Sequence, residues 1–155
     1  MNATANTANR YLADLQVGER WVNSPIAISE QDIIEFGQAY DPQPMHTDKA
    51  LAADGPFGGL IASGWHIAAL AMRLSVQSRS FGGTPIVGAG VDELRWLHPV
   101  RPGDVLTLER TITEIIPPPK PKGRGTVKTL MTMRNQDGKT VLQMTALGKI
   151  PVRPD

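Results

Sequence analysis

The sequence predicts an α+β domain in which an antiparallel sheet wraps around one long apolar helix. The first indication is residues 55–72, which contain no Asp, Glu, Lys or Arg and include a helical stretch that is apolar almost all round. The second is the C-terminal half, where apolar and polar residues alternate as they do in half-buried strands. One long helix followed by a run of antiparallel strands is typical of the α+β class.

The composition is that of a single folded domain. The chain has 155 residues, with 41% hydrophobic and 20% charged residues, which argues against disorder. A net charge of +1 gives no reason to expect nucleic acid or a membrane surface as a partner. The chain contains no cysteine, which excludes disulfides, thiolate metal sites and cysteine nucleophiles. The three histidines show no metal-ligand spacing.

We expect residues 1–9 to be a frayed tail and residues 10–155 to form the domain. The N-terminal segment is polar and has no apolar signal core, so we expect a cytoplasmic protein.

The N-terminal third predicts a short lead-in, a strand and a capped helix. Residues 10–18 are the lead-in, and residues 21–27 are the first expected strand. Ser29 and Asp32 resemble a capping box, which predicts a helix that begins there and runs to Tyr40.

Two further helices are expected before the strands. Residues 47–53 predict a short helix, and residues 55–63 form a glycine-rich approach to the main helix. We expect the main helix over residues 64–80, with Ser63 as its N-cap. Its residues 65–72 are apolar almost all round, which predicts burial on every side.

The remaining elements are strands. Residues 87–96 predict one strand, in which Gly88 and Gly90 indicate a bulge or a close approach. Alternation predicts three more strands, over residues 106–116, 127–134 and 141–146. The segment 135–138, Asn-Gln-Asp-Gly, is typical of a hairpin, so the last two strands should be antiparallel neighbours.

Asp41 and His46 lie at the two ends of a proline-stiffened loop and are the strongest candidates for chemistry. Asp and His are the usual pair for proton transfer near neutral pH. Pro42 and Pro44 prevent the preceding helix from continuing. Fully extended, the loop would span about 16 Å, so joint chemistry requires it to curve back. The alternative is purely structural: Asp41 ends one helix, and Thr47 caps the next.

The start of the main helix has a possible chemical use. Its free backbone N–H groups and positive dipole end can stabilise developing charge on a carbonyl oxygen, and Gly64 would let a substrate approach closely. The alternative is that Gly64 only allows tight packing.

These residues together resemble the hydratase motif of MaoC-like (R)-specific enoyl-CoA hydratases. The family pattern is Asp-x-Asn-Pro-x-His, followed by Phe and by Ile-x-His-Gly. The matching residues here are Asp41, Pro44, His46, Phe57, Ile61 and Gly64. Residues 98–104 also resemble a Pro-Val-x-Pro-Gly-Asp turn of the same proteins, and the similarity covers residues 10–150. Gln43 stands where the family usually has Asn, and Ser63 where it usually has His.

The resemblance implies a hot-dog fold and reversible hydration of a 2-enoyl thioester, with an acyl-CoA as substrate and no cofactor or metal. Asp41 and His46 would be catalytic, while Gly64 and Ser63 would bind the thioester carbonyl. Gln43, Phe57, Ile61, Trp65 and Met72 are weaker candidates for the substrate pocket. The alternatives are a hot-dog thioesterase, or a thioester-binding subunit without catalysis.

Two expectations concern partners. A wrapped sheet leaves an edge and an apolar helix flank uncovered, which predicts a homodimer. The proline-rich loop over residues 117–125 carries Lys120, Lys122 and Arg124. These cations could meet the phosphates of coenzyme A, but a solvated hairpin loop explains them equally well.

Overall fold

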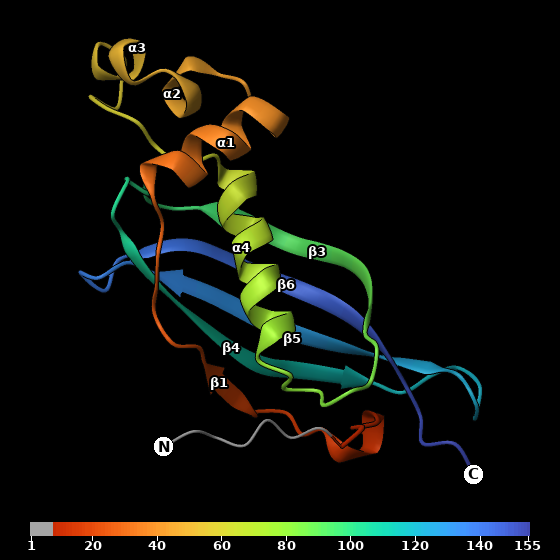
Figure 1. Ribbon diagram of the computed structural model, residues 1–155. Helices are drawn as coiled ribbons and strands as arrows, with labels where there is room; N and C mark the ends of the chain where they lie inside the picture. Colours follow the sequence, from red (N-terminus) through yellow and green to blue (C-terminus); the bar gives the residue numbers. More distant parts are fainter. Residues whose placement is uncertain (1–7) are drawn as a thin grey trace.

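An antiparallel sheet lies against one long helix in the computed structural model, which describes residues 8–155 (Figure 1). The strand order is β1-β4-β5-β6-β3, and β2 pairs separately with β4. The strands are β1 (Arg20–Val22), β2 (Ile26–Ala27), β3 (Val87–Trp96), β4 (Val105–Ile116), β5 (Arg124–Arg134) and β6 (Thr140–Pro151). The predicted bulge in β3 is confirmed by a register shift between Gly88 and Gly90.

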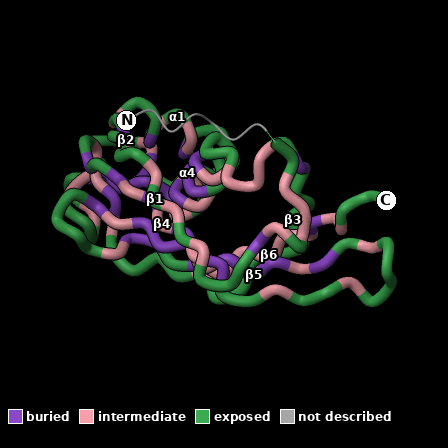
Figure 2. Tube along the Cα trace, turned by 90° about the horizontal axis from the view of Figure 1, so that it is seen from below, coloured by how far each residue is buried: buried purple, intermediate pink, exposed green. Residues whose placement is uncertain are grey.

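The main core lies between the sheet and helix α4 (Gly64–Gln77) (Figure 2). The helix contributes its buried Ile67, Leu70, Ala71 and Leu74. Facing them from the sheet are Leu106, Leu108, Met131, Met133, Leu142 and Met144. The predicted α+β class, with a sheet wrapped around a helix, is therefore confirmed.

Helix α4 differs from its prediction in two ways. It ends at Gln77, with Ser78 as C-cap, rather than at Ser80. Burial on every side is wrong, because the side chains of Trp65, Met72 and Val76 are exposed. These positions are seven and four residues apart, so they form one apolar stripe along the helix.

Three shorter helices lie together at one end of the sheet: α1 (Glu30–Tyr40), α2 (Pro44–Thr47) and α3 (Lys49–Ala53) (Figure 1). The capping box is confirmed, since Ser29 accepts the Asp32 N–H and the Asp32 side chain accepts the Ser29 N–H. The single helix predicted over residues 47–53 is wrong. Asp48 separates α2 from α3, and its side chain caps α3 by accepting the Leu51 N–H at 2.9 Å.

The first predicted strand is also two elements. β1 and β2 both pair with β4, but residues 23–25 interrupt them. Pro25 in this gap has no N–H to donate to a ladder. A short 3₁₀ turn (Leu12–Asp14) precedes β1 in the lead-in segment.

Candidate active site

The loop between α1 and α2 curves back, as joint chemistry by Asp41 and His46 requires. The Gln43 N–H donates to the Asp41 carbonyl at 2.8 Å, and the His46 N–H donates to the Gln43 carbonyl at 2.9 Å. Pro44 occupies the first turn of α2, where its missing N–H is not needed. As a result, Asp41 Oδ2 lies 3.2 Å from His46 Nε2. Thr47 does not cap α3, because Asp48 does so.

The His46 ring is buried and held in one orientation. Its Nδ1 lies 2.7 Å from the carbonyl oxygen of Ile61. A carbonyl can only accept a hydrogen bond, so Nδ1 carries a proton. In the neutral ring, Nε2 therefore has a free lone pair, and this atom faces Asp41. The arrangement makes Nε2 the atom that can take up and give back a proton.

Asp41 is held as a carboxylate by two side chains. Ser63 Oγ donates to Oδ2 at 2.7 Å, and Gln43 Nε2 donates to Oδ1 at 2.8 Å. These two hydrogen bonds, with Ser63 the larger cause, hold the pKa of Asp41 below its ordinary value, although desolvation opposes them. Both residues that depart from the family pattern therefore bind the candidate catalytic carboxylate directly.

Ser63 and Gly64 occupy the start of α4 but do different things. Ser63 is at the N-cap position, yet its hydroxyl makes no capping bond because it binds Asp41 instead. Among residues 8–155, the Gly64 N–H has no hydrogen-bond acceptor. A Cβ at Gly64 would overlap the indole ring of Trp96. Glycine is thus required here by packing, and the same backbone leaves an N–H free.

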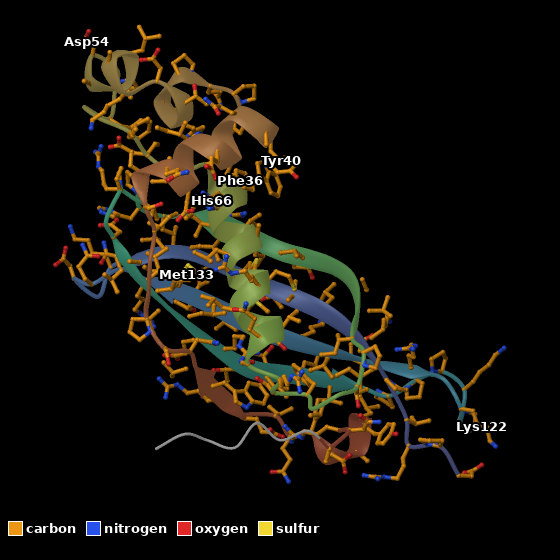
Figure 3. All side chains as sticks on the ribbon, in the orientation of Figure 1. Phe36, Tyr40, Asp54, His66, Lys122 and Met133 are labelled. Atoms are coloured by element: carbon orange, nitrogen blue, oxygen red, sulfur yellow. The ribbon has the colours of Figure 1, made fainter. Side chains whose placement is uncertain are left out.

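The contacts of α1 and of the segment before α4 fix the pair in place. Phe36 of α1 stacks on His66 of α4, with ring centroids 4.6 Å apart and an interplanar angle of 4° (Figure 3). Burial lowers the pKa of His66, which favours the neutral ring in this stack. The Ile61 N–H donates to the Met45 carbonyl, and the Ala62 N–H to the Val100 carbonyl.

A cavity of about 230 Å³ lies beside His46. Phe57, Ile61 and Gly64 line it, together with two aromatic residues that sequence reasoning did not select, Trp96 and His98. Trp96 ends β3 and His98 follows it, and only the fold brings this segment to the motif.

The weaker candidates for the substrate pocket fall in several places. Gln43 binds Asp41 and does not line this cavity. Trp65 is also outside it, exposed and edge-on to Trp96, with centroids 5.2 Å apart. Met72 lines a different cavity at the other end of α4.

The cationic loop between β4 and β5 lies away from the candidate site. Lys122 is at the end of the molecule opposite Asp54, which follows α3 (Figure 3). Its ammonium pairs with Asp155 at 2.6 Å. Within one chain, the loop is a solvated hairpin connection.

Two further observations hold for residues 8–155. No three His, Cys, Asp or Glu side chains there lie close enough together to hold a metal ion. None of the helices in this range has the length and hydropathy needed to cross a membrane.

Comparisons with known proteins place these features in a family. Residues 15–133 match the model of the MaoC-like domain. The crystal structure of a MaoC-like dehydratase from Rhodospirillum rubrum is 39% identical, with a TM-score of 0.81 over 94% of this chain and 99% of that one. The R-hydratase PhaJ1 from Pseudomonas aeruginosa is 30% identical, with a TM-score of 0.75 over 94% of this chain and 88% of that one.

A curated relative is similar over a shorter range. It is a 3-hydroxybutyryl-CoA dehydratase from Methylorubrum extorquens, 31% identical over 112 residues, which are 69% of this chain and 66% of the relative. The two structural neighbours show that the sheet wrapped around α4 is the hot-dog fold expected from the sequence.

Proposed function

The chain belongs to the MaoC-like domain family, and we propose that it reversibly adds water to the double bond of a 2-enoyl thioester. The family and its (R)-hydratase neighbour support a hydratase or dehydratase activity in general. The proposed substrate is an enoyl-CoA, and the proposed product is the (R)-3-hydroxyacyl-CoA. The observation that carries the proposal is the 3.2 Å approach of Asp41 Oδ2 to His46 Nε2 in two separately anchored side chains.

The geometry supports a defined role for each member of the pair. The Asp41 carboxylate accepts one hydrogen of a water molecule, and the lone pair on His46 Nε2 accepts the other. His46 removes its proton as the water oxygen bonds to C3 of the substrate. The resulting imidazolium, stabilised by the Asp41 carboxylate, then gives that proton to C2. The hydroxyl on C3 and the new hydrogen on C2 thus both come from one water molecule. In this proposal no metal or cofactor takes part.

The start of α4 would activate the thioester. In the proposed complex, the carbonyl oxygen accepts the Gly64 N–H, and the positive end of the helix dipole favours the charge that develops on that oxygen. This polarisation makes C3 electrophilic. The Trp96 ring occupies the space where a Cβ at Gly64 would lie, so that side of Gly64 is filled by packing.

The stereochemistry follows from the single pair. Water and proton come from Asp41 and His46 on one side of the double bond, which corresponds to syn addition. The (R) configuration at C3 is proposed from the (R)-hydratase neighbour.

Mixing the purified protein with crotonyl-CoA tests the proposal against its alternatives. Loss of the enoyl absorbance without free thiol is the expected result. Release of free thiol would identify a thioesterase, which uses the same helix start but needs no histidine five residues after the carboxylate. Binding without either change would identify a thioester-binding subunit, which needs neither residue of the pair.

We also propose that the protein is a homodimer. The apolar stripe on α4 (Trp65, Met72 and Val76) is exposed in the single chain. Strand β3 forms one edge of the sheet, and nearly all of its residues are exposed. Such an edge and such a stripe are normally covered, and a second copy would cover both.

A further inference from the structure

A second cavity, of about 540 Å³, lies at the opposite end of α4 from the candidate active site. Its walls come from the last turns of α4, from residues 79–86 and from the inner face of β5 and β6. It shares no lining residue with the cavity beside His46. Ser75 in its wall is eleven residues beyond Gly64, which corresponds to about 16 Å along a helix. The proposed hydration reaction therefore does not account for this cavity.

Beside this cavity lies a buried cation without an anionic partner. Arg110 of β4 is fully buried, and its guanidinium stacks over Trp21 at 5.3 Å. Its side-chain partners are three serine hydroxyls, and among residues 8–155 no carboxylate pairs with it. Burial lowers the pKa of Arg110 to about 10, so the group stays charged at neutral pH. A buried charge without a counter-charge is unfavourable, which makes this position receptive to an anion.

Two of the three serines that bind Arg110 line the cavity. Ser75 Oγ accepts from Nη1 at 3.0 Å, Ser80 Oγ accepts from Nη2 at 2.6 Å, and both serines line the wall. A hydroxyl that accepts from a guanidinium still has its own hydrogen to donate. Ser75 has no acceptor for that hydrogen among residues 8–155.

Thr84 adds an independent observation. It is 7% exposed, it lines the same cavity, and its Oγ1 has no hydrogen-bond partner. Native proteins rarely leave a buried hydroxyl unpaired, and a ligand in the cavity would supply the missing partner. Arg79 contributes a second positive charge to the wall, and no Asp or Glu lines the cavity. The β5 and β6 side is mostly apolar, with Met131 and Ile150 among its residues.

We propose that this cavity is a second binding site, for an aliphatic chain that ends in a carboxylate. The chain lies against β5 and β6, and the carboxylate accepts hydrogen bonds from the hydroxyls of Ser75 and Thr84, with the charge of Arg110 behind them. Two molecules could present this chemistry: a free fatty-acid carboxylate, or the far end of an acyl chain whose thioester lies at Gly64. The second source rests on the proposed function, and the first does not.

Calorimetric titration tests the site with octanoate and with octanol, which has the same chain without the charge. We expect octanoate to bind the wild type at least about tenfold more tightly than octanol, the usual scale for hydrogen bonds to a charged group. Thr84→Val keeps the side-chain shape and should weaken octanoate several-fold. Thr107→Val is the matched control, because Thr107 alternates with the buried Leu106 and Leu108 and lies outside the cavity; it should bind as the wild type does.

Arg110→Met removes the charge at similar volume and should abolish the preference for octanoate over octanol. If this variant does not fold, Thr84→Val still decides the result. Kinetics with 2-hexadecenoyl-CoA and its analogue with a terminal carboxylate, whose chains are long enough to reach from Gly64 to Ser75, separate the two sources. If Thr84→Val weakens the binding of octanoate, the ligand is a free fatty-acid carboxylate. If Thr84→Val instead lowers kcat/KM only for the thioester with the terminal carboxylate, the ligand is the far end of the substrate's own acyl chain. If Thr84→Val changes neither measurement, the proposal is overturned.

Discussion

Replacing Ser63 by alanine should destabilise the protein by an amount that depends on pH. The Ser63 hydroxyl is fully buried and donates to Asp41 Oδ2 at 2.7 Å, a charge-assisted hydrogen bond. Hydrogen bonds to charged groups contribute about 1.5–3 kcal/mol, so Ser63→Ala should lower the free energy of unfolding by about that amount at pH 7. The carboxylate would keep its bond from Gln43, which limits the loss.

The sign of the pH dependence follows from the direction of the pKa shift. The pKa of Asp41 is lower in the folded protein than its ordinary value of 3.8, with the Ser63 hydrogen bond as the largest cause. A group with a depressed folded pKa stabilises the protein above its unfolded pKa, and that stability is lost as the pH falls through the folded pKa. The difference between wild type and Ser63→Ala should therefore be largest at neutral pH and shrink below pH 3.8.

Denaturant unfolding of both proteins from pH 7 into the acid range measures this difference. The matched control is Ser63→Ala in an Asp41→Asn background, where the charge is absent and the substitution should have a much smaller effect. A destabilisation that is the same at every pH, or the same in the Asp41→Asn background, would refute the assigned role of Ser63. It would indicate that the hydroxyl acts only by filling space.

Three further predictions concern catalysis, assembly and packing. Asp41→Asn and His46→Gln should each lower kcat for enoyl-CoA hydration by at least about a hundredfold with the fold intact, because both hold the attacking water, and the double variant should be little worse than the worse single one. Near-wild-type turnover in either single variant would exclude the pair. Light scattering at micromolar concentration should give the mass of a dimer. A monomer mass would contradict the proposal that a second copy covers the apolar stripe on α4 and the edge strand β3. Gly64→Ala should lower the free energy of unfolding by about 1–3 kcal/mol because the new methyl overlaps Trp96, and kcat per folded molecule should fall as well if the Gly64 N–H binds the thioester oxygen. Thermal melting measured beside steady-state kinetics separates these effects, and an unchanged kcat would place the carbonyl-binding group elsewhere.

Local sequence signals predicted the elements whose determinants lie close together in the chain. The capping box at Ser29 and Asp32 fixed the start of α1, and the paired prolines fixed its end near Asp41. The two glycines of β3 predicted its bulge. The Asp41–His46 motif predicted a loop whose chemistry required it to curve back, and the structure shows that it does.

The features that the sequence did not predict depend on contacts between distant segments. The Ser63 hydroxyl binds Asp41, 22 residues away, although its position favours a helix cap. Arg110 lies on the buried face of β4 between Leu108 and Ile112, where alternation alone predicts an apolar residue. The hydrogen-bond partners of Arg110 lie on α4 and on the segment after α4, so no local sequence pattern predicts that this arginine is buried. The exposure of Trp65, Met72 and Val76 on α4 was not predicted either. A helix that is apolar on all sides is expected to be buried, and its sequence does not distinguish burial within its own chain from burial against a second copy.

Hydration of crotonyl-CoA in deuterated water, followed by NMR of the product, tests most directly whether one Asp41–His46 pair supplies both the water and the proton. The proposed mechanism predicts (R)-3-hydroxybutyryl-CoA with a single deuterium at C2, added to the same face as the hydroxyl at C3. Hydroxyl and deuterium on opposite faces would contradict delivery from one pair on one side of the substrate.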